Sequence, residues 1–253
     1  MKKDYLIGTS GWQYADWEGR FYPNKIKAKQ QLSYYNNHFN SVEVNGSFYK
    51  IPTKESVKTW YESVSADFSF TIKANRYFTH SKRLVIDDLF MQRIDLFFSN
   101  ISPLQEKLAC LLFQLPPSMK KDDSRIEKLA EILNNQKRKY NLVFDVAIEV
   151  RNLDWFNPGT LKQFRKLNFA SVIIDSPNKW PASKGLSADF AYLRFHGSKQ
   201  LYHSSYNEKE LRLWADFIKK DCESCRKVFC YFNNDFRANA TKDALKLKSL
   251  ICS

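Results

Sequence analysis

The sequence lacks three features that would assign a protein to a large class. It has no run of eighteen or more apolar residues, so we expect no transmembrane helix and no membrane partner. Its start, Met1 to Tyr5, leads directly into a strand-like segment and not into the hydrophobic stretch of a signal peptide, so we expect a cytoplasmic protein. None of its seven glycines belongs to a Gly-x-Gly-x-x-Gly or Walker loop, so no motif supports a nucleotide cofactor.

Cysteine is scarce and odd in number. The five cysteines have no framework spacing, which argues against a disulfide-built scaffold. Cys222 and Cys225 form a lone Cys-x-x-Cys pair. A zinc site would need a second ligand pair nearby, and a thioredoxin-like motif would open a helix after a strand, whereas this pair closes a helical segment. The sequence therefore gives little support for a metal or redox role of the pair.

Acidic residues are too few to balance the basic ones. The chain has 27 Asp and Glu against 40 Lys and Arg, which gives a net charge of +13 and a pI near 9.4. Such a charge favours anionic partners by long-range attraction, and nucleic acid is one candidate. Most of the lysines, however, fall between apolar positions of helical segments, where they would form ordinary solvated faces.

Strand-like and helix-like segments alternate along the whole chain, which is typical of parallel strands joined by crossover helices. We predict one domain, residues 1–253, that forms a (βα)8 TIM-type barrel. An open doubly wound sheet is the competing fold, but eight units in unbroken order favour closure. The eight predicted strands are Tyr5–Gly11, Ser41–Ser47, Phe68–Asn75, Leu108–Leu115, Leu142–Arg151, Ala170–Ser176, Phe190–Gly197 and Lys227–Asp235.

Apolar residues at helical spacing predict amphipathic helices between the strands. The clearest are Thr53–Val64 and Asn207–Cys222, each of which begins with a cap-like residue and early acids. The last, Ala238–Cys252, would close the ring. The connection Pro177–Ala188 carries two prolines and a glycine and is more typical of a loop with a short helix.

Polar residues collect at the predicted strand ends and keep the period of two that puts them on the inner face. Buried charges are costly unless paired, so the set indicates an ion-pair network, a functional site, or both. Its members are Glu43, Asn45, Thr71, Lys73, Asn75, Glu149, Arg151, Tyr192, Arg194, His196, Tyr231, Asn233 and Asp235. Asp235 alone could instead cap the helix that follows it.

Glu43 and Glu149 are the residues we predict to transfer protons, because burial raises a carboxyl pKa and a neighbouring cation lowers it, so that either role can be tuned. The sequence does not say which is the acid. The nearby cations could bind a carboxylate, a phosphate or a developing oxyanion. They are Lys73, Arg76, Arg151 and Arg194. Lys73 could alternatively form a Schiff base.

His196 and His80 are the two histidines near predicted strand ends, and either could be catalytic or a structural hydrogen-bonding group. A divalent metal could use a subset of Glu43, Glu149, His80, His196 and Asp235. Against this, four cations in the same region would repel a metal ion, and no His-x-His or His-x-x-x-His pair is present. We therefore predict no metal and no other cofactor.

The loop after the first strand carries five aromatic residues. Trp12 and Trp17 could stack on a sugar or a base, whereas Phe21 and Tyr22 are better explained as a small core beneath the loop. Gln114 ends the fourth strand ahead of two prolines and joins the predicted substrate-binding residues.

Several motifs, read together, resemble the YecE-like family of domains of unknown function. They span the chain in order. They are Gly8-Thr9-Ser10-Gly11-Trp12 with Phe21-Tyr22-Pro23, the stretch Phe39 to Asn45 with Ser47-Phe48-Tyr49, Lys73-Ala74 with Thr79-His80, Gln114-Leu115-Pro116-Pro117, Glu149-Val150-Arg151 with Trp155-Phe156, Tyr192 to Gly197, and Phe232 to Asp235.

This resemblance implies a TIM-type barrel, and its motifs coincide with the polar set, but it implies no reaction. The barrel also resembles those of apurinic endonucleases and xylose isomerases, which is a weak guide to function. Three positions depart from the family pattern. Asn152 stands where histidine is frequent, Ser47 where threonine is usual, and Ala238 where glycine often follows the Asn-Asn-Asp turn.

The leading hypothesis is an enzyme that applies general acid/base chemistry to a small anionic or hydroxylated substrate, such as a sugar or a phosphorylated compound. Glu43 and Glu149 would move protons, assisted by Lys73 and His196. The predicted substrate-binding residues are Trp12, Asn45, Arg76, His80, Gln114, Arg151, Arg194, Asn233 and Asp235. A metal-assisted, endonuclease-like nucleic-acid protein and a non-catalytic binding protein are the alternatives.

Overall fold

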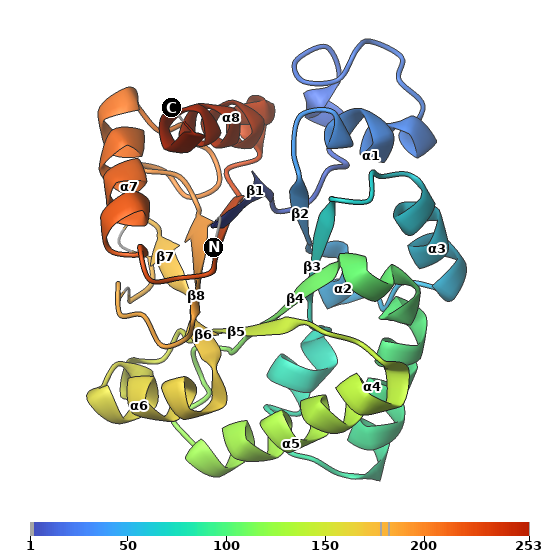
Figure 1. Cartoon of the computed structure of the whole chain (residues 1–253), viewed down its shortest axis with the longest axis vertical. Coiled ribbons are helices and arrows are strands. Elements are labelled where there is room, and N and C mark those ends of the chain that lie inside the picture. Colours follow the sequence, from blue (N-terminus) through green and yellow to red (C-terminus); the bar gives the residue numbers. More distant parts are fainter. Residues whose placement is uncertain (1–2, 178, 182, 253) are drawn as a thin grey trace.

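The structure is a computed structural model of the chain, and it describes residues 3–177, 179–181 and 183–252. Parallel strands occupy the centre and helices surround them (Figure 1). The strands are β1 (Asp4–Thr9), β2 (Ser41–Val44), β3 (Ser69–Lys73), β4 (Leu108–Gln114), β5 (Asp145–Glu149), β6 (Phe169–Ser171), β7 (Ile173–Asp175), β8 (Phe190–Phe195) and β9 (Lys227–Phe232).

The strands form two parallel sheets with the orders β1-β9-β8-β7 and β2-β3-β4-β5-β6. The two sheets meet at β1 with β2 and at β6 with β7 and β8, so that together they form a barrel with two seams. This is the TIM-type barrel that the alternating segments predict. None of the helices in the described residues is both long and apolar enough to cross a membrane.

Side chains bridge the seam between β1 and β2 in place of a backbone ladder. The amide of Asn40 accepts from the backbone N–H of Ile7 and donates to the carbonyl of Tyr5. The Tyr35 hydroxyl accepts from the N–H of Thr9 and donates to the carbonyl of Ser41. Four backbone groups along this seam, those of Tyr5, Ile7, Thr9 and Ser41, are thereby hydrogen-bonded, as buried backbone groups require.

The second seam corrects the prediction of a single sixth strand over Ala170–Ser176. The backbone N–H of Val172 still bonds to β5, but from Ile173 onwards the chain pairs with β8. The hydroxyl of Ser187 accepts from the N–H of Ser171 and donates to the carbonyl of Phe169, and so replaces ladder partners on the open side of β6. The predicted strand is therefore two short strands, one in each sheet.

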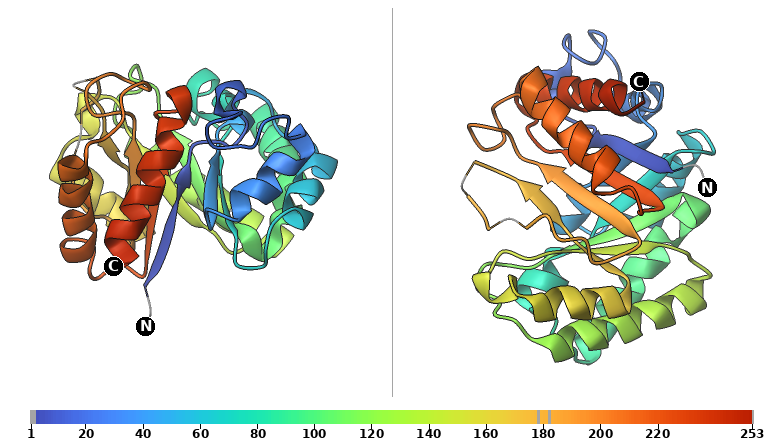
Figure 2. Two further views of the ribbon diagram at one scale, coloured as in Figure 1. Left: turned by 90° about the horizontal axis from the view of Figure 1, so that it is seen from above. Right: turned by 60° about the vertical axis from the view of Figure 1, so that its left-hand side comes forward.

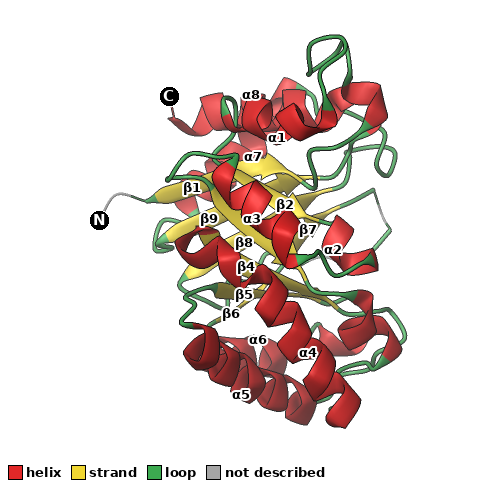
Figure 3. Ribbon diagram, turned by 90° about the vertical axis from the view of Figure 1, so that its right-hand side faces the viewer, coloured by secondary structure: helices red, strands yellow, loops and turns green. Residues whose placement is uncertain are grey.

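Helices cover the outside of the barrel, as the side views show (Figures 2 and 3). They are α1 (Ala28–Asn36), α2 (Gly46–Tyr49), α3 (Lys54–Glu62), α4 (Asp88–Ile101), α5 (Asp123–Tyr140), α6 (Pro158–Leu167), α7 (Glu208–Lys220) and α8 (Asn239–Cys252). Helix α8 lies beside β1 and so links the two ends of the chain.

The predicted helices and their caps are confirmed. Thr53 accepts from the N–H of Ser56 at the start of α3, and Asn207 forms a reciprocal capping box with Glu210 at the start of α7. The connection Pro177–Ala188 is a loop, and its described residues contain no helix. Asn178 and Ala182, which belong to this connection, lie outside the described residues.

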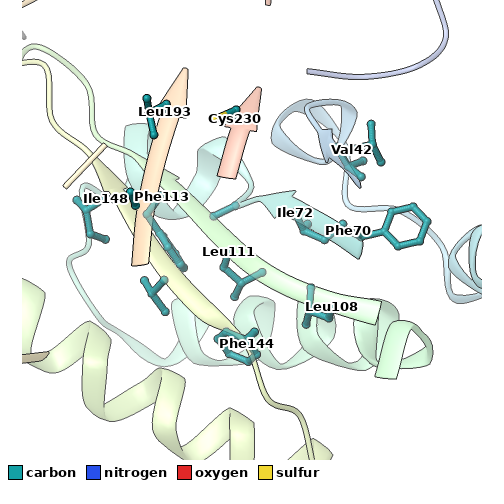
Figure 4. Close-up of a cluster of buried hydrophobic side chains, with 14 of the residues drawn as sticks. Val42, Phe70, Ile72, Leu108, Leu111, Phe113, Phe144, Ile148, Leu193 and Cys230 are labelled. Atoms are coloured by element: carbon teal, nitrogen blue, oxygen red, sulfur yellow. The ribbon is translucent and has the colours of Figure 1, made fainter. Parts of the chain in front are cut away.

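Alternate residues of each strand enter two different cores. Outward residues pack beneath the helices, and Figure 4 shows a part of this layer around Phe70, Leu111 and Phe113. Inward residues fill the lower part of the barrel, among them Leu112, Tyr192 and Phe229. The predicted period of two is thus confirmed, and polar side chains complete the upper end of the lumen.

Most strands end earlier than predicted. The chain turns into α2 at Gly46, so Asn45 follows β2 instead of belonging to it. Arg151, His196 and Asn233 likewise lie one or two residues beyond their strands. They belong to the loops at the C-terminal end of the barrel, which we call the mouth.

Candidate functional site

A buried arginine of one sheet joins two carboxylates of the other sheet. Arg194 of β8 donates from Nη2 to Glu43 of β2 over 2.7 Å and from Nη1 to Glu149 of β5 over 2.5 Å. All three side chains are at most 1% exposed. The prediction that charged residues from distant strands meet inside the barrel is therefore confirmed, and the ion-pair network is real.

Both carboxylates have their oxygens occupied. Glu43 also accepts from Ser10 Oγ over 2.7 Å and from the Tyr192 hydroxyl over 2.5 Å. Glu149 accepts from Arg151 Nε over 2.7 Å. Burial alone would raise the pKa of Glu149, but the charges of Arg194 and Arg151 outweigh it and hold the pKa well below its ordinary value. Glu149 is thus kept ionised at neutral pH, which makes it a poor proton carrier.

Lys73 lies beside this network without being neutralised by it. Its Nζ donates to Gln114 Oε1 over 2.7 Å and lies 4.4 Å from the centre of the Phe48 ring. Among the described residues no carboxylate lies within 4.0 Å of this amine. Burial, followed by the charge of Arg194, lowers the pKa of Lys73 to about 7. A large share of the amine is therefore unprotonated at neutral pH.

Two buried nitrogen atoms near Lys73 have no hydrogen-bond partner among the described residues: Arg194 Nε and His196 Nε2. His196 Nδ1 lies 3.1 Å from Asn233 Nδ2, so Nδ1 is the acceptor and Nε2 carries the proton of a neutral ring. Burial and the charge of Arg194 lower the pKa of His196 well below its ordinary value, which agrees with a neutral ring. Both free atoms are thus N–H donors.

Arg151 and His80 complete the polar groups of the mouth. The guanidinium of Arg151 lies 3.7 Å from the centre of the Trp180 ring, which also contacts the ring of His196 at 5.2 Å. His80 is half-buried on the π-helical turn after β3, and Thr79 hydrogen-bonds its Nδ1. Burial, then the charges of Lys73 and Arg151, lower its pKa to about 4. We call Glu43, Lys73, Glu149, Arg151, Arg194 and His196 the polar ring.

The remaining predicted residues lie at increasing distance from this centre. Gln114 and Asn233 contact Lys73 and His196 directly. Asn45 is bonded to the carbonyl of Ser10 at the edge of the mouth. Arg76, in contrast, is exposed to solvent.

Asp235 lies on the β1 side of the mouth and does not cap the helix after it with its side chain. Its carbonyl accepts from Trp17 Nε1, and its Oδ1 is buried with no partner among the described residues. Burial, then the nearby charges of Glu43 and Asp16, raise the pKa of Asp235 to about 8.

The hypothesis that both tryptophans of the first loop stack on a ligand is wrong for Trp17. Its ring is 0% exposed and packs against Tyr14, Phe21 and Tyr22, so it belongs to the small core beneath the loop. Trp12 is 6% exposed, and it forms part of the wall of a pocket at the edge of the mouth. The prediction that Phe21 and Tyr22 are core residues is confirmed.

The three departures from the family pattern have local explanations. Ala238 has a φ of 60°, a left-handed conformation that glycine adopts without strain. Ser47 Oγ donates to the carbonyls of Val44 and Lys73 and so ties β2 to β3. Asn152 donates to the carbonyl of Pro117 and accepts from Asp154 N–H, so it holds two loops together.

Two residues of the site escaped the sequence analysis. Ser10 follows β1 and binds Glu43, and its place in the Gly8 to Trp12 motif was the available signal. Trp180 covers Arg151 from a loop without periodicity, and no pattern pointed to it. Within the described ranges, no three His, Cys, Asp or Glu residues are grouped so that they could hold a metal ion. Cys222 and Cys225 are buried free thiols.

Comparisons with known proteins agree on one family. The family model described as protein of unknown function DUF72 matches residues 6–252. The UPF0759 protein YunF of Bacillus subtilis is 26% identical over 272 residues, which covers 97% of this chain and 94% of that protein. The UPF0759 protein YecE of Escherichia coli K12 is 29% identical over 151 residues, 57% of this chain and 52% of YecE.

Solved structures show the same fold. The crystal structure of a DUF72 family protein from Thermotoga maritima superposes with a TM-score of 0.83 at 26% identity, over 99% of this chain and 100% of that one. A DUF72 family protein from Enterococcus faecalis gives a TM-score of 0.77 at 22% identity, over 100% and 99%. The similarity therefore extends over the whole barrel.

Proposed function

Because the chain belongs to the DUF72 family, whose description assigns it no reaction, we propose a function from the chemistry of the barrel mouth. The protein is an enzyme that binds a small anionic or hydroxylated substrate at the polar ring and transfers a proton through Lys73. Sugar-like and phosphorylated compounds carry the oxygen atoms that such a site would bind.

The observation that carries this proposal is the pair of unused donors. Buried N–H groups are almost always hydrogen-bonded in folded proteins, and Arg194 Nε and His196 Nε2 have no acceptor among the described residues, so both can donate to a bound ligand. An oxygen atom of a substrate, and above all an oxyanion, would satisfy both. Arg151 adds a positive charge on the same side of the barrel.

Lys73 is the group best suited to take a proton. A catalytic base works best when its pKa lies near the working pH, and the surroundings of this amine bring its pKa to about 7. Glu43 and Glu149, which the sequence favoured for this task, instead fix the position of Arg194 and keep it charged. We assign them a positioning role and keep the Schiff-base alternative for Lys73 as an outcome of the experiment.

A nucleic-acid substrate is the weaker candidate. The net charge of +13 would attract a phosphate backbone. The burial of Trp17 removes one of the two rings that were to stack on bases. Phosphate binding at the polar ring is common to both candidates, so the first experiment should use small ligands and the second short oligonucleotides.

The test is a proton-exchange assay. Sugar phosphates, keto acids and hydroxy acids would be incubated with the protein in D2O, and loss of each substrate C–H signal would be followed by proton NMR. We expect exchange with the unaltered chain and with Lys58→Met, an exposed lysine on α3, and none with Lys73→Met. Exchange that persists in Lys73→Met would refute the proposal. Trapping of a keto substrate on Lys73 by borohydride would favour the Schiff base.

A further inference from the structure

A pocket of about 490 Å³ opens at the edge of the mouth, between the loop after β1 and the segment that joins β2 to α3. Pockets of this size accommodate molecules with one or two rings. Residues of the first loop, of α2 and of α3 line it. The lining residues used below include Ser10, Trp12, Asn45, Gly46, Ser47 and Trp60.

The walls favour a flat and uncharged occupant. Trp12 and Trp60 meet edge to face with ring centres 5.5 Å apart, and Ile51 and Pro52 add apolar surface. None of the lining residues is acidic and Lys50 is basic, so the pocket offers a ligand cation no carboxylate partner. Aromatic walls of this kind bind other rings well.

One polar atom gives the pocket a chemical preference. Asn45 Oδ1 is buried and has no hydrogen-bond partner among the described residues. The Asn45 amide nitrogen makes a long bond of 3.5 Å to the carbonyl of Ser10, which fixes the oxygen as the side that faces away from that carbonyl. A buried acceptor of this kind calls for an N–H or O–H donor.

The pocket adjoins the polar ring, because two of its lining residues hydrogen-bond to residues of that ring. Ser10 lines it and donates to Glu43, and Ser47 lines it and donates to the carbonyl of Lys73. A molecule in the pocket therefore lies next to residues that contact the polar ring.

We propose that this pocket binds the body of the substrate: a neutral aromatic or heteroaromatic ring with an N–H or O–H group for Asn45, carried by a molecule whose anionic end reaches the polar ring. This inference rests on the proposed function, because the anionic end is the part on which Lys73 acts. It narrows the substrate class from small anions in general to ring compounds with an acidic group.

Three small probes separate the parts of this inference in calorimetric titrations. Indole offers a ring and an N–H donor, 1-methylindole offers the ring alone, and indole-3-acetate adds a carboxylate. We expect indole to bind about five- to tenfold more tightly than 1-methylindole, which is the range for one net hydrogen bond. Indole-3-acetate should bind more tightly than indole. Equal binding of indole and 1-methylindole would overturn the role of Asn45.

Gly46 supplies a matched pair of variants. A Cβ atom at this position would meet no atom within 4 Å, so substitution does not force the backbone. Gly46→Trp should fill the pocket and weaken indole binding at least tenfold, whereas Gly46→Ala should leave it unchanged. Unchanged indole binding in Gly46→Trp, or no indole binding by the unaltered chain at millimolar concentration, would overturn the inference.

Inorganic phosphate distinguishes this inference from the proposed function. Phosphate should bind the unaltered chain and Gly46→Trp alike, and should bind His196→Phe, which lacks the unused Nε2 donor, at least tenfold more weakly. If His196→Phe binds phosphate as tightly as the unaltered chain, while indole binding is weakened in Gly46→Trp and not in Gly46→Ala, the proposed function fails, and with it the assignment of the pocket to its substrate. If phosphate binding changes as expected but indole binds Gly46→Trp as tightly as the unaltered chain, only the assignment of the pocket fails.

Discussion

The amine of Lys73 donates to the side-chain oxygen of Gln114 over 2.7 Å, on the neighbouring strand of the barrel. This bond holds the amine in place without giving it a negative partner. Arg194, in the same lumen, has two carboxylates. One cation of the mouth is thus compensated and permanently charged, whereas the other is free to exchange its proton, and this difference governs the predictions for the two residues.

The first prediction concerns Lys73 and pH. Its pKa is about 7 in the folded chain and near 10.5 when unfolded, so between these values the unfolded state binds more protons and stability rises with pH. Replacement by methionine removes this contribution. We expect the stability of Lys73→Met relative to the unaltered chain to fall by on the order of 3 kcal/mol between pH 7 and pH 10.

Urea unfolding of both proteins at pH 7, 8.5 and 10 would measure this difference. Tyrosines and cysteines titrate in the same window, but their contribution cancels between the two proteins. Lys58→Met, an exposed lysine on α3, is the control and should show a constant difference. A constant difference for Lys73→Met as well would contradict the lowered pKa.

The contribution of Asp235 to stability should change with pH in the opposite direction. Burial and the charges of Glu43 and Asp16 raise its pKa to about 8, so between pH 4 and pH 8 the folded chain keeps a proton that the unfolded chain has lost. Stability from this group is therefore complete below pH 4 and is lost as the pH rises through this window. Asp235→Asn should lose less stability than the unaltered chain from pH 5 to pH 8, as followed by urea unfolding. The exposed Asp216→Asn should behave like the unaltered chain, and an identical pH profile for Asp235→Asn would count against the prediction.

Removal of Arg194 should lower the stability of the fold far more than removal of either carboxylate, Glu43 or Glu149. Arg194→Met leaves Glu43 and Glu149 buried without their shared cation, and breaking such a pair costs about 3–5 kcal/mol. Adding Glu43→Gln and Glu149→Gln to this variant removes the uncompensated charges and should recover part of the loss. Thermal unfolding at pH 7 would compare the unaltered chain, Arg194→Met and the triple variant. A triple variant no more stable than Arg194→Met would show that the ion pairs are not the cause.

The polar ring could be predicted from sequence because it obeys a simple rule. Residues of one parity on parallel strands enter one lumen, so Glu43, Glu149 and Arg194 meet although they are far apart in the chain. The rule does not predict which of these side chains form ion pairs or hydrogen bonds with each other. The sequence favoured the glutamates as proton carriers, and only the geometry shows that both are occupied by Arg194 while Lys73 has no carboxylate partner among the described residues.

The features that sequence analysis missed depend on contacts between distant segments. Trp180 lies in a loop with no periodic pattern, so nothing indicated that it would cover Arg151. The break between β6 and β7 depends on Ser187, whose hydroxyl replaces a strand partner from fifteen or more residues away. The seam between β1 and β2 was missed for the same reason. The side chains of Asn40 and Tyr35 there accept hydrogen bonds from the backbone N–H groups of β1, in place of a backbone partner.

The seam between β1 and β2 leads to the last prediction, because it sets how closely the strands approach. At Gly8 of β1, a Cβ atom would lie 2.0 Å from the carbonyl oxygen of Ser41 and 2.7 Å from the Tyr35 hydroxyl. Neither atom can move freely, since the first is backbone and the second bonds to both strands. Gly8→Ala should therefore force the strands apart and cost at least about 3 kcal/mol, the upper range for overpacking.

Gly46→Ala is the matched control, since the added methyl group meets no atom within 4 Å. It should change the free energy of unfolding, measured in urea, by no more than about 0.5 kcal/mol, the range of ordinary surface substitutions. Gly8 precedes Ser10, which binds Glu43, so a displaced β1 should also weaken phosphate binding at the polar ring. If Gly8→Ala were as stable as Gly46→Ala, the strands would have to be farther apart than the structure places them, and the side-chain bridges of Asn40 and Tyr35 would not close the barrel.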